Sequence, residues 1–145
     1  DANEASIRST LNWGHTFAHA LEAYAHKKNI DIMHGEAVLI GIIFATNLSK
    51  IVLNFESFDE EHQLIDILKS RYFLQIRKHL LEINIEDIYP SILNDKKNDN
   101  SNSDTKWILL SDWGQVNKSE NSYLTAVKRE SIVICLEKLK QILRE

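Results

Sequence analysis

Residues 37–53 constrain the fold of this chain more than any other stretch. They read AVLIGIIFATNLSKIVL, and at about 100° per residue the apolar side chains go almost all the way round a helix. A helix with this pattern is buried on most of its sides. Because the run is too short and too interrupted for a membrane span of about 20 apolar residues, it predicts the central helix of a globular core.

Apolar residues at helical spacing predict further helices before and after this run. In order, we expect a helix over about 5–26, a polar link over 27–32, the central helix from His34 or Gly35, a break at 54–57, a third helix capped by Asp59 and carrying Leu64, Ile67, Leu68 and Tyr72, a helix over 85–93 and a last helix over about 125–143. Pro90 should disturb or restart the helix that contains it. Residues 73–83 form either a continuation of the third helix or a separate short helix.

The segment between the last two helices has a different composition. Residues 94–106 are rich in Asn, Asp, Ser and Lys, which is typical of a solvated loop. The sequence then predicts a small β-hairpin. Its first strand is the apolar run 107–110, its turn is residues 112–114 and its second strand is Gln115–Val116, with Trp107 and Trp113 as packing anchors. The fold class we expect is mainly α, as one helical domain over residues 1–145.

Charge and cysteine content exclude several classes of protein. A net charge of -4 and a pI of about 5.9 argue against a nucleic-acid or membrane-surface binder, since both need a basic face. Cys135 is the single cysteine and has apolar neighbours, so we expect a buried thiol in a reducing, cytoplasmic setting. The expected partner is a small molecule or another protein. The chain begins with Asp1 and not Met, so we expect it to be part of a longer polypeptide.

The candidate chemistry lies in residues 4–36. On a continuous helix, one polar arc beside the apolar seam would contain Glu4, Arg8, Asn12, His15, His19, Glu22 and His26. Gly14 and Ala18 lie on the seam and would let another helix approach closely. His15 and His19 are four residues apart, the spacing of helical histidines that share a metal or a substrate. A cation and an amide beside these imidazoles suit an anionic, hydroxylated ligand.

His34 adds a third imidazole at the predicted start of the central helix. There the helix dipole disfavours the protonated ring and favours a neutral ring that can bind metal. Two histidines are too few for a catalytic zinc ion, which usually has three protein ligands. Glu36 could be the third ligand, or it could orient His34 without touching the metal. A third possibility is a ligand upstream of Asp1.

These motifs carry a resemblance to a known family. The resemblance lies in the segments LNWGHTFAHALE (11–22) and MHGEAVLIGI (33–42). It extends to Glu4 and Arg8 before these segments and to the Asp95-Lys96-Lys97 loop and WILLSDWG after them. In these segments the chain resembles the C-terminal domain of 3-dehydroquinate synthase, a member of the sugar-phosphate cyclases. The resemblance covers nearly the whole chain. It implies a helical domain that sits against an N-terminal, NAD-binding domain absent from this chain, in a cytoplasmic enzyme that works as a homodimer.

The resemblance also implies a role for each matched residue. His15 and His34 would be ligands of a divalent metal, zinc or cobalt, with a third, carboxylate ligand from the N-terminal domain. Glu4 and His19 would have acid/base roles, while Arg8, Asn12 and one or both of Lys96 and Lys97 would bind the substrate. In the family, NAD oxidises a hydroxyl of 3-deoxy-arabino-heptulosonate 7-phosphate, phosphate is eliminated, the carbonyl is reduced, and ring closure gives 3-dehydroquinate. This reaction belongs to the shikimate pathway of aromatic amino acid biosynthesis.

The sequence is also consistent with other functions. Within the enzyme class the alternatives are another sugar-phosphate cyclase or a metal-dependent alcohol dehydrogenase relative, although the set Glu4, Arg8, Asn12 and His19 favours the synthase over the dehydrogenase. Outside that class, the chain could be a catalytically silent domain kept for dimerisation or scaffolding. On the synthase reading, we predict that the 145-residue chain alone neither binds NAD tightly nor turns over substrate.

Overall fold

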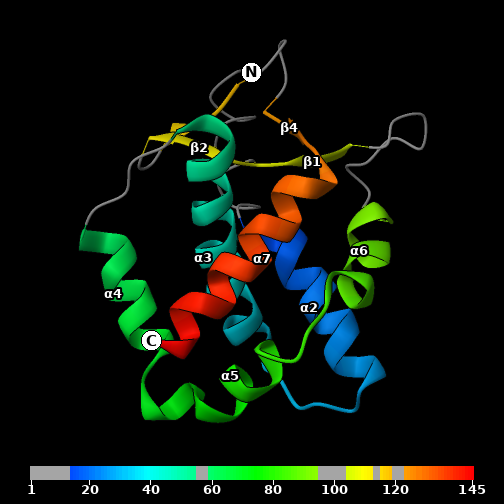
Figure 1. Ribbon diagram of the computed structural model, residues 1–145, viewed down its shortest axis with the longest axis vertical. Coiled ribbons are helices and arrows are strands. Elements are labelled where there is room, and N and C mark those ends of the chain that lie inside the picture. The colour runs from blue at the N-terminus through cyan, green and yellow to red at the C-terminus, as the bar shows by residue number, and fades with distance from the viewer. Residues whose placement is uncertain (1–13, 55–58, 95–103, 113–114, 119–122) are drawn as a thin grey trace.

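A computed structural model of the chain describes residues 14–54, 59–94, 104–112, 115–118 and 123–145. Within these ranges the fold is mainly helical, as expected, with two small two-stranded sheets (Figure 1). The helices are α2 (His15–Lys27), α3 (His34–Leu53), α4 (Asp59–Leu68), the 3-10 helix η1 (Arg71–Phe73), α5 (Leu74–Leu80), α6 (Ile85–Leu93) and α7 (Arg129–Arg144). The strands are β1 (Thr105–Trp107), β2 (Leu110–Asp112), β3 (Gln115–Val116) and β4 (Thr125–Val127).

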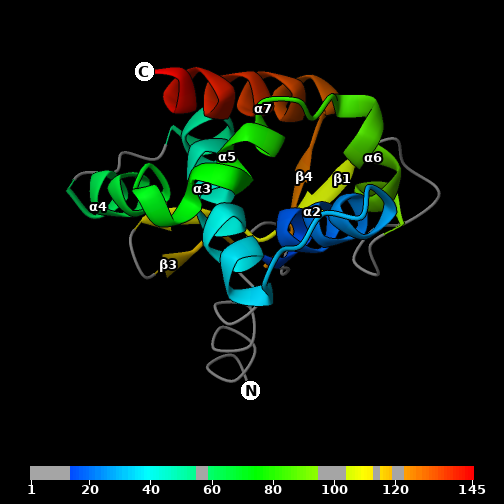
Figure 2. The same ribbon diagram turned by 90° about the horizontal axis from the view of Figure 1, so that it is seen from below.

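Helix α3 is the centre of the fold. It contacts α2, α7, α4 and β2, and the two views show α4 and α6 at opposite edges of the molecule with α3 between them (Figures 1 and 2). By length and hydropathy, α3 is the one helix of the described residues that could cross a membrane, but 56% of its apolar window is buried inside the protein. Its composition is that of a core helix, and the prediction from residues 37–53 is confirmed.

A stack of aromatic rings joins α2, α3 and β1. The rings of Phe17 and Phe44 are parallel, with centroids 4.0 Å apart, and Phe44 stacks on Trp107 at 5.6 Å. All three side chains are buried, and the Trp107 indole N–H donates a hydrogen bond to Thr105 Oγ1 over 2.8 Å. Aromatic pairs at these separations contribute stability beyond their buried area. Trp107 is therefore the packing anchor that the sequence predicts, while Trp113 lies outside the described residues.

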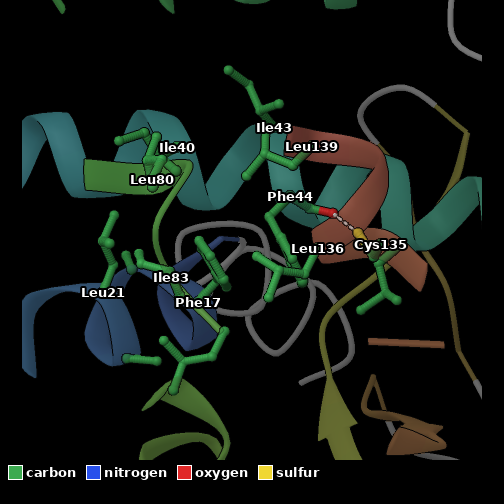
Figure 3. Close-up of a cluster of buried hydrophobic side chains, with 14 of the residues drawn as sticks. Phe17, Leu21, Ile40, Ile43, Phe44, Leu80, Ile83, Cys135, Leu136 and Leu139 are labelled. Carbon is green, nitrogen blue, oxygen red and sulfur yellow. Dashed lines mark hydrogen bonds between the residues drawn. The ribbon is translucent and has the colours of Figure 1, made fainter. Parts of the chain in front are cut away.

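Leucine and isoleucine side chains from several helices surround this stack. Figure 3 shows Leu21 of α2 and Ile40 of α3 beside Leu80 of α5, with Leu136 and Leu139 of α7 closing the cluster. Cys135 of α7 is fully buried among them, and its thiol donates to the Phe44 carbonyl oxygen over 3.4 Å (Figure 3). The sequence prediction of a buried thiol at Cys135 is confirmed.

The first helix does not run unbroken from residue 5 to residue 26. Gly14 has φ +84° and precedes the first residue of α2, a left-handed conformation that cannot continue a right-handed helix and that favours glycine. The prediction of one continuous helix is wrong at this point. The helical phase that grouped Glu4, Arg8 and Asn12 with His15 therefore does not extend across Gly14. Those three residues lie outside the described part of the chain.

Gly14 and Gly41 form a close contact between α2 and α3. A Cβ atom built on Gly41 would lie 2.0 Å from the Gly14 carbonyl oxygen and 3.1 Å from the Ala18 amide nitrogen. No side chain fits in such a space, so the glycine lets the two backbones touch. The close helix approach that the sequence predicts at Gly14 and Ala18 is confirmed, with Gly41 as its partner.

The strands differ in part from the single predicted hairpin. β2 and β3 pair antiparallel, with Leu110 opposite Val116, as expected. Trp107 instead belongs to β1, which pairs antiparallel with β4 through Trp107 and Thr125. Residues 105 and 106 are thus strand and not loop. The last helix begins at Arg129 and not near Thr125, because the residues of β4 alternate buried, exposed, buried.

The remaining helices are the ones that the sequence predicts, but some of their ends differ from the predicted ends. The third helix ends at Leu68, and Tyr72 lies in η1, exposed to solvent. Residues 74–80 form a separate short helix, which was one of the two expected outcomes. α6 continues through Pro90 to Leu93 without a restart. Pro90 is the sixth of the nine residues of this helix, so its missing N–H removes one hydrogen bond close to the C-terminal end.

Candidate functional site

The site begins at the first turn of α2, where the chain leaves the left-handed Gly14. His15 is the first residue of this helix and is half-buried. Its Nδ1 atom is buried and has no hydrogen-bond partner among the described residues. A buried nitrogen without a partner costs free energy. The ring of His15 therefore has an unused donor or acceptor at the surface of the core.

His19 lies one turn further along α2. Its ring meets that of His15 edge to face, with centroids 5.6 Å apart and an interplanar angle of 72°. Unlike His15, His19 is exposed to solvent. The spacing of four residues thus brings the two imidazoles together, as the sequence predicts, on a face of α2 that solvent can reach.

A tight reversal after α2 returns the chain towards its start. Asn29 adopts φ +59°, the Asn29 amide donates to the His26 carbonyl oxygen, and the Ile30 amide donates to the Ala25 carbonyl oxygen over 2.8 Å. These two hydrogen bonds around a left-handed residue form a Schellman motif, in which asparagine can replace the usual glycine. The reversal lets α3 begin only a few residues later and pack along α2.

His34, the first residue of α3, reaches the same place from the second helix. Its ring centroid is 5.9 Å from that of His15, with an interplanar angle of 52°. The side chain is 62% exposed. His15, His19 and His34 therefore form one cluster, built from two helices that the glycine contact fixes against each other.

Two carboxylates lie close to this cluster and make different contacts. Glu22 Oε2 of α2 is 3.2 Å from His34 Nδ1. Glu36 Oε1 instead accepts a hydrogen bond from the Met33 amide over 2.8 Å, which caps the N-terminus of α3. Among the described contacts, the carboxylate that meets His34 is thus Glu22. The sequence left the orienting role open for Glu36 and gave Glu22 none, although Glu22 follows His15 by two helical turns on the same face.

The cluster fits the imidazole part of a metal site. Two rings bound to one zinc ion through Zn–N bonds of about 2.0–2.1 Å have centroids about 5–6 Å apart, and both His15 pairs have that spacing. The Nδ1 atom of His34 also meets a carboxylate, that of Glu22, which is the usual kind of partner for a metal-bound histidine. No group of three His, Cys, Asp or Glu side chains in the described ranges could hold a metal. A complete site therefore needs a donor from outside these ranges.

Several predicted site residues cannot be compared with this geometry. Glu4, Arg8, Asn12, Lys96 and Lys97 lie outside the described residues. Cys135 is described but is far from the solvent, and burial raises the pKa of its thiol. Because a thiolate is the metal-binding and nucleophilic form, Cys135 is a core residue and no part of the chemistry.

The architecture has a counterpart among solved structures. It superimposes on 2-deoxy-scyllo-inosose synthase, crystallised with carbaglucose-6-phosphate, NAD+ and Co2+, with a TM-score of 0.66 over 88% of this chain and 34% of that chain. The sequences are 22% identical. At that identity the likeness concerns the fold.

Sequence comparison is more specific. The profile of the 3-dehydroquinate synthase C-terminal family matches residues 1–98. The 3-dehydroquinate synthases of Alkaliphilus oremlandii and Dichelobacter nodosus are 40% identical over 98 residues and 38% identical over 123 residues. These matches cover 68% and 79% of this chain but only 25% and 29% of the relatives, so the chain spans less than a third of their length. The chain belongs to the 3-dehydroquinate synthase C-terminal family.

Proposed function

We propose that this chain is the metal- and substrate-binding part of a 3-dehydroquinate synthase, which converts 3-deoxy-arabino-heptulosonate 7-phosphate to 3-dehydroquinate with loss of phosphate. The observation that carries the proposal is the meeting of His15 and His34, from two helices, in a chain 37% to 40% identical to three synthases of this name. The rest of the enzyme would be a preceding domain that binds NAD.

His15 and His34 would hold a divalent metal, zinc or cobalt, together with a carboxylate of the preceding domain. When bound, NAD would accept and return a hydride, and the metal would polarise the oxygens at the reacting carbons. The two histidines come from different helices, so the angle between their rings depends on how α2 packs on α3. The glycine contact between these helices would keep both rings in a fixed relation as substrate enters.

The remaining site residues would divide into proton transfer and binding. His19 is exposed beside His15, and its imidazole would exchange a proton with the bound substrate. Glu4 would share this acid/base work. Arg8 and Asn12, with Lys96 or Lys97, would bind the phosphate, carboxylate and hydroxyl groups of the substrate. The resemblance to the family supports these roles.

We also propose the cellular setting and the partners of the complete enzyme. The complete enzyme would be a cytoplasmic homodimer in which each active site lies between the two domains of one chain. Its partners would be a small phosphorylated sugar acid and its own N-terminal domain, without nucleic acid or membrane. The 145-residue chain alone would neither bind NAD tightly nor turn over substrate.

The test is phosphate release from 3-deoxy-arabino-heptulosonate 7-phosphate by the complete polypeptide. We expect turnover that needs NAD, stops on removal of the metal with a chelator and returns on addition of zinc or cobalt. His19→Asn should lower kcat by about 10²–10⁴-fold, the usual contribution of acid/base catalysis, and change KM less.

Two results would contradict the proposal. A complete polypeptide that binds no metal and releases no phosphate would fit the silent, scaffolding domain instead. Sustained phosphate release by the 145-residue chain on its own would contradict the division of the site between two domains.

A further inference from the structure

Glu22 connects the two helices that carry the candidate metal ligands. It lies on α2, seven residues after His15, and its Oε2 atom is 3.2 Å from Nδ1 of His34 on α3. This contact joins residues 12 apart in sequence. Glu22 is thus on the helix of one candidate ligand and in contact with the other.

The chemistry of the contact selects one form of the His34 ring. An ionised carboxylate can only accept hydrogen bonds, so Nδ1 must carry the proton. In a neutral imidazole the lone pair then lies on Nε2. A histidine without such a partner mainly carries its proton on Nε2, which would block that nitrogen as a metal ligand.

We infer that Glu22 is a positioning residue of the metal site, which holds His34 with its proton on Nδ1 and with Nε2 turned towards the metal. The inference rests on the proposed function, because it takes His34 as a ligand. A purely structural role is a poor explanation of the pair. The two side chains are 62% and 33% exposed, and exposed ion pairs stabilise a fold only slightly.

Glu36 provides a matched control. It is also a glutamate near His34, two residues further along, but its Oε1 atom accepts from the Met33 amide at the start of α3. Glutamine at Glu36 removes the same charge and keeps the cap, since glutamine is also found at this position of capping boxes. Glu22→Gln and Glu36→Gln therefore make the same chemical change, one at the contact with His34 and the other at the cap of α3.

The first experiment measures the dissociation constant for zinc by chelator competition, in the complete polypeptide. Glu22→Ala should weaken zinc binding about 10–100-fold, as changes to outer partners of ligating histidines do. Glu22→Gln keeps an acceptor oxygen and should weaken it less, while Glu36→Gln should leave it unchanged. His34→Ala is the reference for loss of a ligand. Circular dichroism of each variant distinguishes a local effect on zinc binding from unfolding. If Glu22→Ala does not fold, the zinc affinity of Glu22→Gln is compared with that of Glu36→Gln instead.

The second experiment reads the ring directly and needs no metal. Nitrogen-15 NMR of the histidines should find the His34 proton on Nδ1 in the wild type and mainly on Nε2 in Glu22→Ala, with Glu36→Gln like the wild type. An unchanged tautomer and unchanged zinc affinity in Glu22→Ala would overturn the inference alone. Wild-type zinc affinity in His34→Ala would overturn the ligand assignment of the proposed function, and the inference with it.

Discussion

The two ends of α3 differ in what surrounds them. At its start, Met33 is 63% exposed and His34 carries an exposed imidazole. Between Ile40 and Ser49, most of the helix is buried against α2, α7 and β2, and Ser49 Oγ accepts a hydrogen bond from the Leu110 amide over 2.9 Å. One helix thus has an exposed end, which carries the candidate ligand His34, and a structural end, which is part of the core. The candidate site residues of α2 and α3 therefore lie at the edge of a core whose packing sets where the two helices meet.

The largest effect should come from the structural end. Phe44→Ala removes a fully buried ring that stacks between Phe17 and Trp107, and we expect a loss of about 3–5 kcal/mol in the free energy of unfolding. Urea unfolding, followed by tryptophan fluorescence and circular dichroism, measures it. Ile134→Ala, at a side chain 55% exposed on α7, should stay within about 0.5 kcal/mol of the wild type. Equal losses in the two variants would contradict the assignment of the core.

A smaller effect is expected where the core meets the site. Gly41→Ala would direct a methyl group at the Gly14 carbonyl oxygen, 2.0 Å away, so α2 must move away from α3 at a cost of about 1–3 kcal/mol in stability. Because His15 follows Gly14 directly, zinc affinity of the complete polypeptide should fall as well.

Gly35→Ala is the control for this change. It lies in the same helix beside His34, but no atom is within 4 Å of the added Cβ, so stability should be unchanged or slightly raised. If Gly41→Ala behaves like Gly35→Ala, the close helix contact does not position the site.

The sequence predicted the structural end of α3 well and the local details around it less well. Residues 37–53 carry apolar side chains on almost every side of the helix, and such a helix leaves water only by being buried. The central position of α3 therefore follows from the residue types in this segment. The continuous helix through Gly14 was predicted wrongly because periodicity gives the spacing of side chains and not the backbone angle φ. The glycine itself, directly before His15, is a signal for a helix boundary. At β4 the alternation of Thr125 and Val127 is only three residues long, too short to compete with the helical pattern that follows.

For the site, sequence spacing predicted what lies within one helix. His15 and His19 meet because they are one turn apart, and that much follows from helical geometry. The approach of His34, and the partner role of Glu22, depend on how the loop after α2 reverses and how α2 crosses α3. Those features arise from the Schellman turn at Asn29 and the contact of two glycines, which residue spacing does not encode.

On the proposed function, His15 and His34 bind one metal at the exposed start of α3, beside a core that we expect to be stable without it. The most direct measurement is the zinc content and zinc affinity of the complete polypeptide with His15→Ala, His34→Ala and the control His26→Ala, an exposed histidine at the other end of α2. We expect both site variants to lose stoichiometric zinc while His34→Ala unfolds within about 0.5 kcal/mol of the metal-free wild type, and His26→Ala to bind zinc normally. Unchanged zinc content in both His15→Ala and His34→Ala would contradict the claim.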